Sequence, residues 1–389
     1  MESNTEIADV HEISERHVQS LYELLRQVPD HRAKRGRRYE AATVLVILLL
    51  AKLAGESTLS GIAYWARLRG AWFKEVLGLK QLPCANTYAY ICAHIDVAEL
   101  TAAVRVWLAQ VAPECPANAW VQWAIDGKVL RGSHRYTPVT QGGQEMLNVY
   151  AVETGTLHHC QMIASKGYEA QTAYDFVRQT NCQNVVITAD ALHTRPRFAR
   201  RIRKQKGHYV FIVKGNRAEL EADIRHLFAL PPHPHYPVQT AKAVDPGHGR
   251  LITRQLWTSS ELNLALKQEW QDIAQVFVLE RRGTRNGKPV YESVCGLTSL
   301  PPAQASPAHL LAYVQRHWYI ENRCHWRRDA TLREDACTVR QPPVAIILAV
   351  LNSAILALLD HCQVTNARMA IRTFAAFPDQ ALTLLTQPL

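Results

Sequence analysis

The chain has 389 residues, of which 48% are hydrophobic and 20% are charged. This is the composition of a globular protein, and it excludes a mostly disordered or fibrous chain. With 44 Lys and Arg against 34 Asp and Glu, the formal net charge is +10, which favours a polyanionic partner such as nucleic acid or an anionic membrane surface.

Residues 1–112 are predicted to form an N-terminal helical domain used in DNA binding or assembly. Its apolar periodicity places the main helices over 37–54, 59–78 and 97–111. Thr58 is placed to cap the second of these helices, and Asp96 with Glu99 forms a capping box that opens the third. The short links between these helices indicate a small bundle.

Two apolar stretches need to be tested as membrane spans. The first, 44–54, contains Lys52, and the second, 344–359, contains Asn352 and Ser353. A span needs about 20 predominantly apolar residues, so both stretches are predicted to be buried helices. We therefore expect no membrane partner, and nucleic acid becomes the preferred polyanion.

The cysteines and the N-terminus indicate a cytoplasmic protein. There are nine cysteines, an odd number, and no two of them stand at CxxC spacing, so we expect reduced thiols rather than a disulfide scaffold. Residues 1–9 are polar and acidic and lack the apolar core of a signal peptide.

After a boundary loop at 113–118 the pattern changes to that of an α/β protein. Strands and helices alternate in a way that predicts a mixed sheet over 118–228, with elements at 120–125, 146–152, 157–163, 170–180, 184–189, 195–206 and 209–213. A proline-rich linker then leads into a β-rich insertion over 229–300, with strands expected at 250–258, 273–281 and 290–298. Residues 301–389 return to helical periodicity, at 308–328 and 344–359, and are predicted to complete the core.

Carboxylates at strand ends are the feature that points to chemistry. Asp126 follows the apolar stretch 120–125, and Asp190 follows 184–189. In an open α/β sheet the carboxyl ends of strands point into the crevice where ligands bind. Each Asp alone is also consistent with a turn or a helix cap. The two in similar contexts together favour a metal site.

Glu321 is the third candidate carboxylate. On a continuous helix it would share one face with His317, His325 and Arg328. The simpler interpretation is a surface glutamate in local ion pairs. However, the helix is rich in aromatic residues and partly apolar, and an unpaired carboxylate is costly there. A metal ion or the basic neighbours would relieve that cost.

The order of these elements resembles the DDE transposases of bacterial insertion sequences, and more narrowly the branch of H-repeat-associated proteins. The resemblance covers about residues 20–360. The matching motifs stand in order at 28–32, 61–66, 124–132, 187–194, 209–216, 247–254, 317–322 and 333–336. The chain departs from the wider superfamily at Val314, His317 and Arg328, where that superfamily has Tyr, Arg and Lys.

This resemblance implies a ribonuclease-H-like core in which Asp126, Asp190 and Glu321 are the catalytic, metal-binding triad. It also implies two Mg²⁺ ions, with Mn²⁺ able to substitute, because hard oxygen ligands and substrate phosphate suit these cations. The implied partners are DNA, both as terminal inverted repeats and as target, and a second copy of the chain in a homodimer on DNA.

Basic residues are the candidates for DNA contact. The segment after Asp190 carries a dense run of cations with no acid among them, whereas solvated helix faces usually mix signs. The predicted DNA-binding set is Lys128, Arg195, Arg197, Arg200, Arg201, Lys204, Lys214, Arg250, His317 and Arg328. A solvated face is the alternative explanation for the run.

The sequence therefore predicts a DNA transposase that hydrolyses one strand at the element ends and transfers it to target DNA. Two alternatives stay open. A degenerate or domesticated relative would bind DNA without chemistry, and a Mg²⁺-dependent nuclease would cut DNA without joining it.

Overall fold

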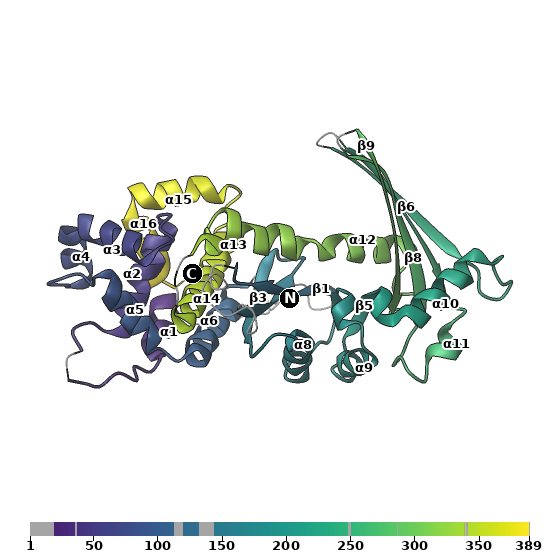
Figure 1. Ribbon diagram of the computed structural model, residues 1–389, viewed down its shortest axis with the longest axis horizontal. Coiled ribbons are helices and arrows are strands. Elements are labelled where there is room, and N and C mark those ends of the chain that lie inside the picture. Colours follow the sequence, from purple (N-terminus) through teal and green to yellow (C-terminus); the bar gives the residue numbers. More distant parts are fainter. Residues whose placement is uncertain are drawn as a thin grey trace, which may run out of the picture.

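The computed structural model describes residues 19–35, 37–112, 120–131, 144–247, 250–285, 287–337, 339 and 341–388. Its centre is a nine-stranded mixed sheet with the strand order β3-β2-β1-β4-β5-β9-β8-β7-β6. Helices pack on both faces of this sheet. A helical region lies at one end of the molecule, and a long antiparallel ribbon extends from the other (Figure 1). The predicted α/β fold with a β-rich insertion and N-terminal helices is confirmed.

The N-terminal region contains α1 (Leu21–Gln27), α2 (Ala41–Leu53), α3 (Leu59–Leu68), α4 (Gly70–Leu77), α5 (Ala85–Ala93) and α6 (Val97–Val111). Thr58 caps α3 and Asp96 caps α6, each side chain accepting a hydrogen bond from the backbone N–H three residues later. The helix expected over 59–78 is divided at Arg69, which leaves the helical conformation with φ −111° and ψ 25°. Its guanidinium donates a hydrogen bond to the carbonyl of Ala375.

The N-terminal helices share one hydrophobic core with α14 (Pro342–His361), α15 (Ala367–Ala376) and α16 (Pro378–Thr386). All residues of α2 are buried, as predicted for this apolar stretch. Among the described helices, α14 alone is long and apolar enough to cross a membrane, and 78% of its most apolar window is buried inside the protein. It packs against α6 and β3, so its apolar surface is used in the core.

The first part of the sheet contains β1 (Val121–Val129), β2 (Glu145–Ala151), β3 (Thr156–Ile163), β4 (Val185–Ala189) and β5 (His208–Val213). β1, β4 and β5 are parallel, whereas β2 is antiparallel to β1 and β3 is antiparallel to β2. Helices α8 (Glu169–Arg178), α9 (Pro196–Lys204) and α10 (Ala218–Ala229) bury one face through a cluster that includes Ile187. The neighbouring Val186 points to the other face, against α12 (Pro307–His317). Burial on both sides explains the continuous apolar run of β4.

The insertion continues the same sheet. β9 (Lys288–Thr298) pairs antiparallel with β5, and β8 (Gln275–Arg285), β7 (Arg250–Ser259) and β6 (Gln239–Gly247) follow outward. Three strands are expected from the sequence, and the structure has four. β6 is the edge strand and is largely solvent-exposed, so it lacks the apolar alternation that marks the other three.

The predicted helix over 308–328 is three consecutive segments. α12 ends at His317, a π-helical turn (η3) spans Ile320–His325, and α13 covers Trp326–Ala330. A π turn inserts an extra residue into the helical repeat and is frequently found at functional sites. It changes which side chains of this segment share a face.

Candidate active site

Asp126 and Asp190 are placed side by side by the register of two parallel strands. The last paired residues of β1 and β4 are Ile125 and Ala189, and the two aspartates come directly after them. Asp190 lies just beyond the end of β4, and its Oδ1 accepts a hydrogen bond from the backbone N–H of Leu192 at 2.9 Å. Asp126 does not end β1, because that strand continues to Val129 in its pairing with β2.

Glu321 reaches this sheet edge from the π turn. The Nδ1 atom of His325 lies 3.5 Å from Asp126 Oδ2 and 3.5 Å from Glu321 Oε2. Oxygen and nitrogen atoms of these three residues all lie within 4.8 Å of one another, close enough to hold one metal ion. Asp190 is not part of that group. The structure therefore brings Glu321 directly to Asp126, with Asp190 beside them.

The three carboxylates line one cleft of about 220 Å³. Its walls come from the ends of β1, β4 and β5 and from α12 and the π turn. Besides the triad, the cleft is lined by Lys214, His317 and the largely exposed ring of Trp318. An anionic floor next to an exposed cation is suited to a phosphodiester bound through a metal ion.

The cleft holds more negative charge than its own cations balance. Burial, and then the charges of Glu169, Asp190 and Glu321, raise the pKa of Asp126 to about 8. Contact with His325 lowers the pKa of Glu321, although burial acts in the opposite direction. All three triad residues offer hard carboxylate oxygens, the ligands that Mg²⁺ prefers. A divalent cation therefore fits this site both in charge and in ligand type.

Glu169 is a fourth carboxylate, and no pattern in the sequence marks it. It is the first residue of α8, and its Oε1 lies 2.8 Å from Nε2 of the buried His193. Its carboxylate packs against Gly127, where a Cβ atom would lie 2.5 Å from Glu169 Cδ. Because no apolar strand precedes Glu169 in the chain, the strand-end pattern that identifies the two aspartates does not find it.

Two family models match the chain. A model described as transposase DDE domain matches residues 123–358, and one described as DDE_Tnp_1-associated matches residues 22–108. The chain belongs to the transposase DDE domain family. This confirms the resemblance on which the triad was assigned.

The proteins similar to the chain include the following curated relatives and solved structure. A protein of Xanthobacter autotrophicus, named only for its position 3′ of dhlA, is 29% identical to this chain. The match covers 70% of this chain and 92% of that protein. YncI of Escherichia coli O157:H7, a transposase by inference, is 23% identical over 89% of this chain and 88% of its own. YhhI of E. coli K12, an H repeat-associated transposase by inference, is 22% identical, and the match covers 90% of this chain and 93% of YhhI. A piggyBac transposase synaptic complex with hairpin DNA superposes with a TM-score of 0.49 at 12% identity, over 93% of this chain and 81% of the other.

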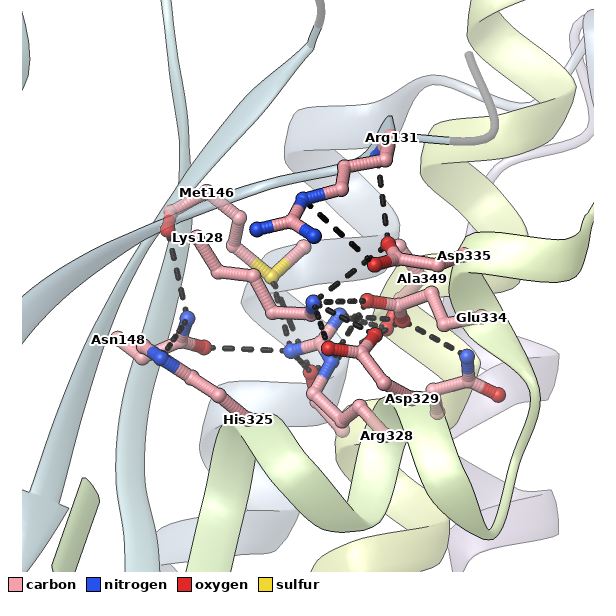
Figure 2. A network of polar contacts seen from close by, with 12 residues as sticks. Lys128, Arg131, Met146, Asn148, His325, Arg328, Asp329, Glu334, Asp335 and Ala349 are labelled. Atoms are coloured by element: carbon pink, nitrogen blue, oxygen red, sulfur yellow. Dashed lines mark hydrogen bonds and ion pairs between the residues drawn. The ribbon is translucent and has the colours of Figure 1, made fainter. Parts of the chain in front are cut away.

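Two residues predicted to bind DNA in this transposase-family chain are instead buried in an ion-pair network (Figure 2). The side chain of Lys128 is only 6% exposed, and its Nζ lies 2.7 Å from Asp329 Oδ1. Further carboxylates, of Glu334 and Asp335, lie 3.9 and 3.7 Å away. Its cation is satisfied inside the protein, so the prediction that Lys128 contacts DNA is wrong for this structure.

Arg328 is likewise a structural residue. Its side chain is fully buried, with its Nε 3.0 Å from both carboxylate oxygens of Glu334 and its Nη2 2.7 Å from Oε2. The prediction that Arg328 shares a face with Glu321 and contacts DNA is wrong, because the π turn between them rotates the following residues. His325 does face Glu321, as predicted.

His317 lines the cleft as a neutral ring. Burial lowers its pKa to about 4, and its Nδ1 lies 3.2 Å from the hydroxyl of Thr188. It can therefore offer a hydrogen bond but no positive charge near neutral pH. Of the predicted cations, Lys214 is the one described residue that lines the cleft with an exposed charge.

The remaining predicted cations lie mainly on α9 and just before it. Arg195, Arg197, Arg200 and Lys204 are exposed. Arg201 is half-buried and donates a hydrogen bond to the Tyr174 hydroxyl at 2.7 Å, while the Arg197 guanidinium lies 4.1 Å from the centre of the same ring. Arg250 begins β7, but its side chain lies outside the described part of the structure.

Proposed function

We propose that the cleft is the active site of a transposase that cleaves DNA at the ends of an insertion sequence and joins the freed 3′ end to target DNA. The register that sets Asp126 beside Asp190, with Glu321 brought in by the π turn, carries this proposal. These three side chains would hold two Mg²⁺ ions, or Mn²⁺ in their place. Such ions, when bound, activate the attacking oxygen and stabilise the leaving oxygen.

The chemistry needs no covalent protein intermediate. In the first step water attacks a phosphorus atom at the element end, the bond to the 3′ oxygen breaks, and a 3′-hydroxyl is released. In the second step that hydroxyl attacks a target phosphodiester and displaces a new 3′-hydroxyl. The exposed Lys214 would contact a phosphate oxygen in the cleft, and the neutral His317 would donate a hydrogen bond next to it.

DNA would be held along the exposed cations of Arg195 and of α9. Arg197, Arg200 and Lys204 are three and four residues apart and so lie along one side of the helix. Phosphate contacts of this kind give affinity without sequence preference. We further propose that residues 1–112 act in DNA binding or assembly, and that two copies of the chain bring the terminal inverted repeats together before joining to target.

The deciding assay uses labelled DNA carrying the terminal repeats, incubated with the full chain and Mg²⁺ and analysed for nicks and for joined products. Asp190→Asn removes one candidate ligand while keeping the shape. It should abolish cleavage and leave DNA affinity nearly unchanged, because the cations supply most of that affinity. Asp223→Asn, on the exposed side of α10, is the matched control and should cleave like the original chain.

Each result distinguishes the alternatives. Nicks without joined products would indicate a nuclease. Binding with no cleavage under Mg²⁺ or Mn²⁺ would indicate a degenerate DNA-binding relative. Cleavage by Asp190→Asn at the original rate would mean that this aspartate is only a turn residue, and the triad assignment would be wrong.

A further inference from the structure

A buried hydrogen-bond network connects the ion pair of Arg328 to the candidate active site. Asn148, which has no exposed surface, lies on β2 directly opposite Asp126. Its Oδ1 lies 3.3 Å from Arg328 Nη1, and its Nδ2 lies 3.3 Å from the carbonyl oxygen of Met146. The same Nδ2 lies 3.3 Å from Nε2 of His325 (Figure 2).

The orientation of the Asn148 amide is decided by chemistry alone. A guanidinium can only donate hydrogen bonds, so the amide atom that faces Arg328 must be the oxygen. A backbone carbonyl can only accept, so the atom that faces Met146 must be the nitrogen. Because one partner can only donate and the other can only accept, the alternative orientation, with the amide oxygen and nitrogen exchanged, is excluded. Arg328 is itself fixed by Glu334 and by the carbonyl of Ala349, which accepts from its Nη2 at 3.1 Å.

This orientation sets the tautomer of His325. Because an N–H of Asn148 points at Nε2, that ring nitrogen must carry a lone pair and accept the hydrogen bond. The ring proton of the neutral imidazole is then on Nδ1, since the partner of one nitrogen determines the state of the other. Nδ1 is the atom that lies 3.5 Å from both Asp126 and Glu321. Its proton faces two carboxyl oxygens that can accept it, whereas a lone pair there would face the lone pairs of these oxygens.

We propose that His325 is a positioning residue whose Nδ1–H holds Asp126 and Glu321 together, and that Arg328 acts on the site through Asn148 by fixing this tautomer. A nitrogen that carries a proton cannot bind a metal ion, so ligation is left to the carboxylates, even though His325 lies within metal-binding distance of both. The inference deepens the proposed function and rests on it for its catalytic consequence, but the tautomer itself does not depend on that function.

The tautomer can be read directly by long-range ¹H–¹⁵N NMR of the full chain with ¹⁵N-labelled histidine. The His325 signals are those that disappear in His325→Gln. We expect the Nδ1–H pattern in the metal-free protein and the same pattern after Mg²⁺ is added. His193 is an internal reference for the opposite form, because its Nε2 faces the Glu169 carboxylate. An Nε2–H pattern for His325, with or without Mg²⁺, would overturn the proposal.

Asn148→Asp tests the catalytic consequence. The new carboxylate keeps a partner for Arg328 but accepts from Nε2–H, so the proton should move to Nε2. Mg²⁺-dependent cleavage should then fall about 10- to 100-fold, as is typical when a residue behind the metal ligands is changed. Asn181→Asp, the same chemical change at an exposed turn, should alter neither the tautomer nor the rate.

The outcomes of the two measurements are separable. If His325 were itself a ligand, Asn148→Asp would expose its Nδ1 lone pair and tighten Mg²⁺ binding with cleavage retained, which would refute the proposal. If Asn148→Asp does not fold, the spectrum of the original chain still decides the tautomer. If the original chain does not cleave DNA at all, the proposed function fails while the tautomer assignment is judged on the spectrum.

Discussion

The Arg328–Glu334 pair gives the sharpest stability prediction. Both side chains are buried, at 0% and 6% exposure, and their closest atoms are 2.7 Å apart. Burial opposes ionisation of Glu334, yet Arg328 and Lys128 bring its pKa below the usual value. Glu334→Gln keeps the size of the side chain but leaves the buried guanidinium without its counter-charge. Loss of one partner from a buried pair costs about 3–5 kcal/mol, and we expect the free energy of unfolding to fall by that amount.

The measurement is urea denaturation followed by tryptophan fluorescence, with a second ion pair as control. Arg282 and Glu280 on β8 are 2.6 Å apart, but the Arg282 side chain is 66% exposed. Glu280→Gln should therefore cost less than about 1 kcal/mol. The two pairs have nearly the same separation, so burial is the variable compared. Equal and small losses in both variants would refute the view that this network supports the core.

Two further predictions concern DNA and pH. Replacing the exposed cations of α9 with Gln should weaken binding to all DNA sequences alike and flatten the dependence of log affinity on log salt by about 0.9 for each phosphate that is no longer neutralised. The set to replace is Arg197, Arg200 and Lys204. An unchanged slope in a folded variant would place the DNA elsewhere. Asp126 has a raised pKa in the folded state, so its contribution to stability is present at low pH and is lost as pH rises from 3.8 through about 8. In EDTA, Asp126→Asn should thus be more stable than the original chain above pH 8, with the difference vanishing toward pH 4 in thermal denaturation. A difference that does not change with pH would contradict this explanation.

The parts of the site that follow from local patterns were predictable from the sequence. Asp126 and Asp190 stand after apolar strands, and parallel strand ends share one edge of a sheet. The core strands are marked by continuous apolar runs in the sequence. The helix caps at Thr58 and Asp96 are marked by side chains that can accept a hydrogen bond from the backbone. These signals are carried by a few consecutive residues, so no knowledge of distant contacts is needed to find them.

The wrong predictions concern residues whose role is determined by contacts with residues far away in the sequence. Lys128 and Arg328 are cations in a basic, motif-rich context, and only the structure places carboxylates around them. The π turn cannot be recognised from a helical pattern, and it moves Arg328 away from the face of Glu321. Glu169 acts on Asp126 from its position against Gly127, a close approach that depends on the packing of α8 against the sheet.

The open end of the sheet has a consequence for how copies of this chain can meet. β6 offers one row of backbone groups with no neighbouring strand in the described structure, and such an edge invites pairing with another chain. Pro246 has no N–H to donate, and Lys242 is a charged residue on the same strand. Both features oppose the addition of a tenth strand. The ribbon is thus protected along β6 against edge-to-edge aggregation, although that strand is long and lies at the edge of the sheet.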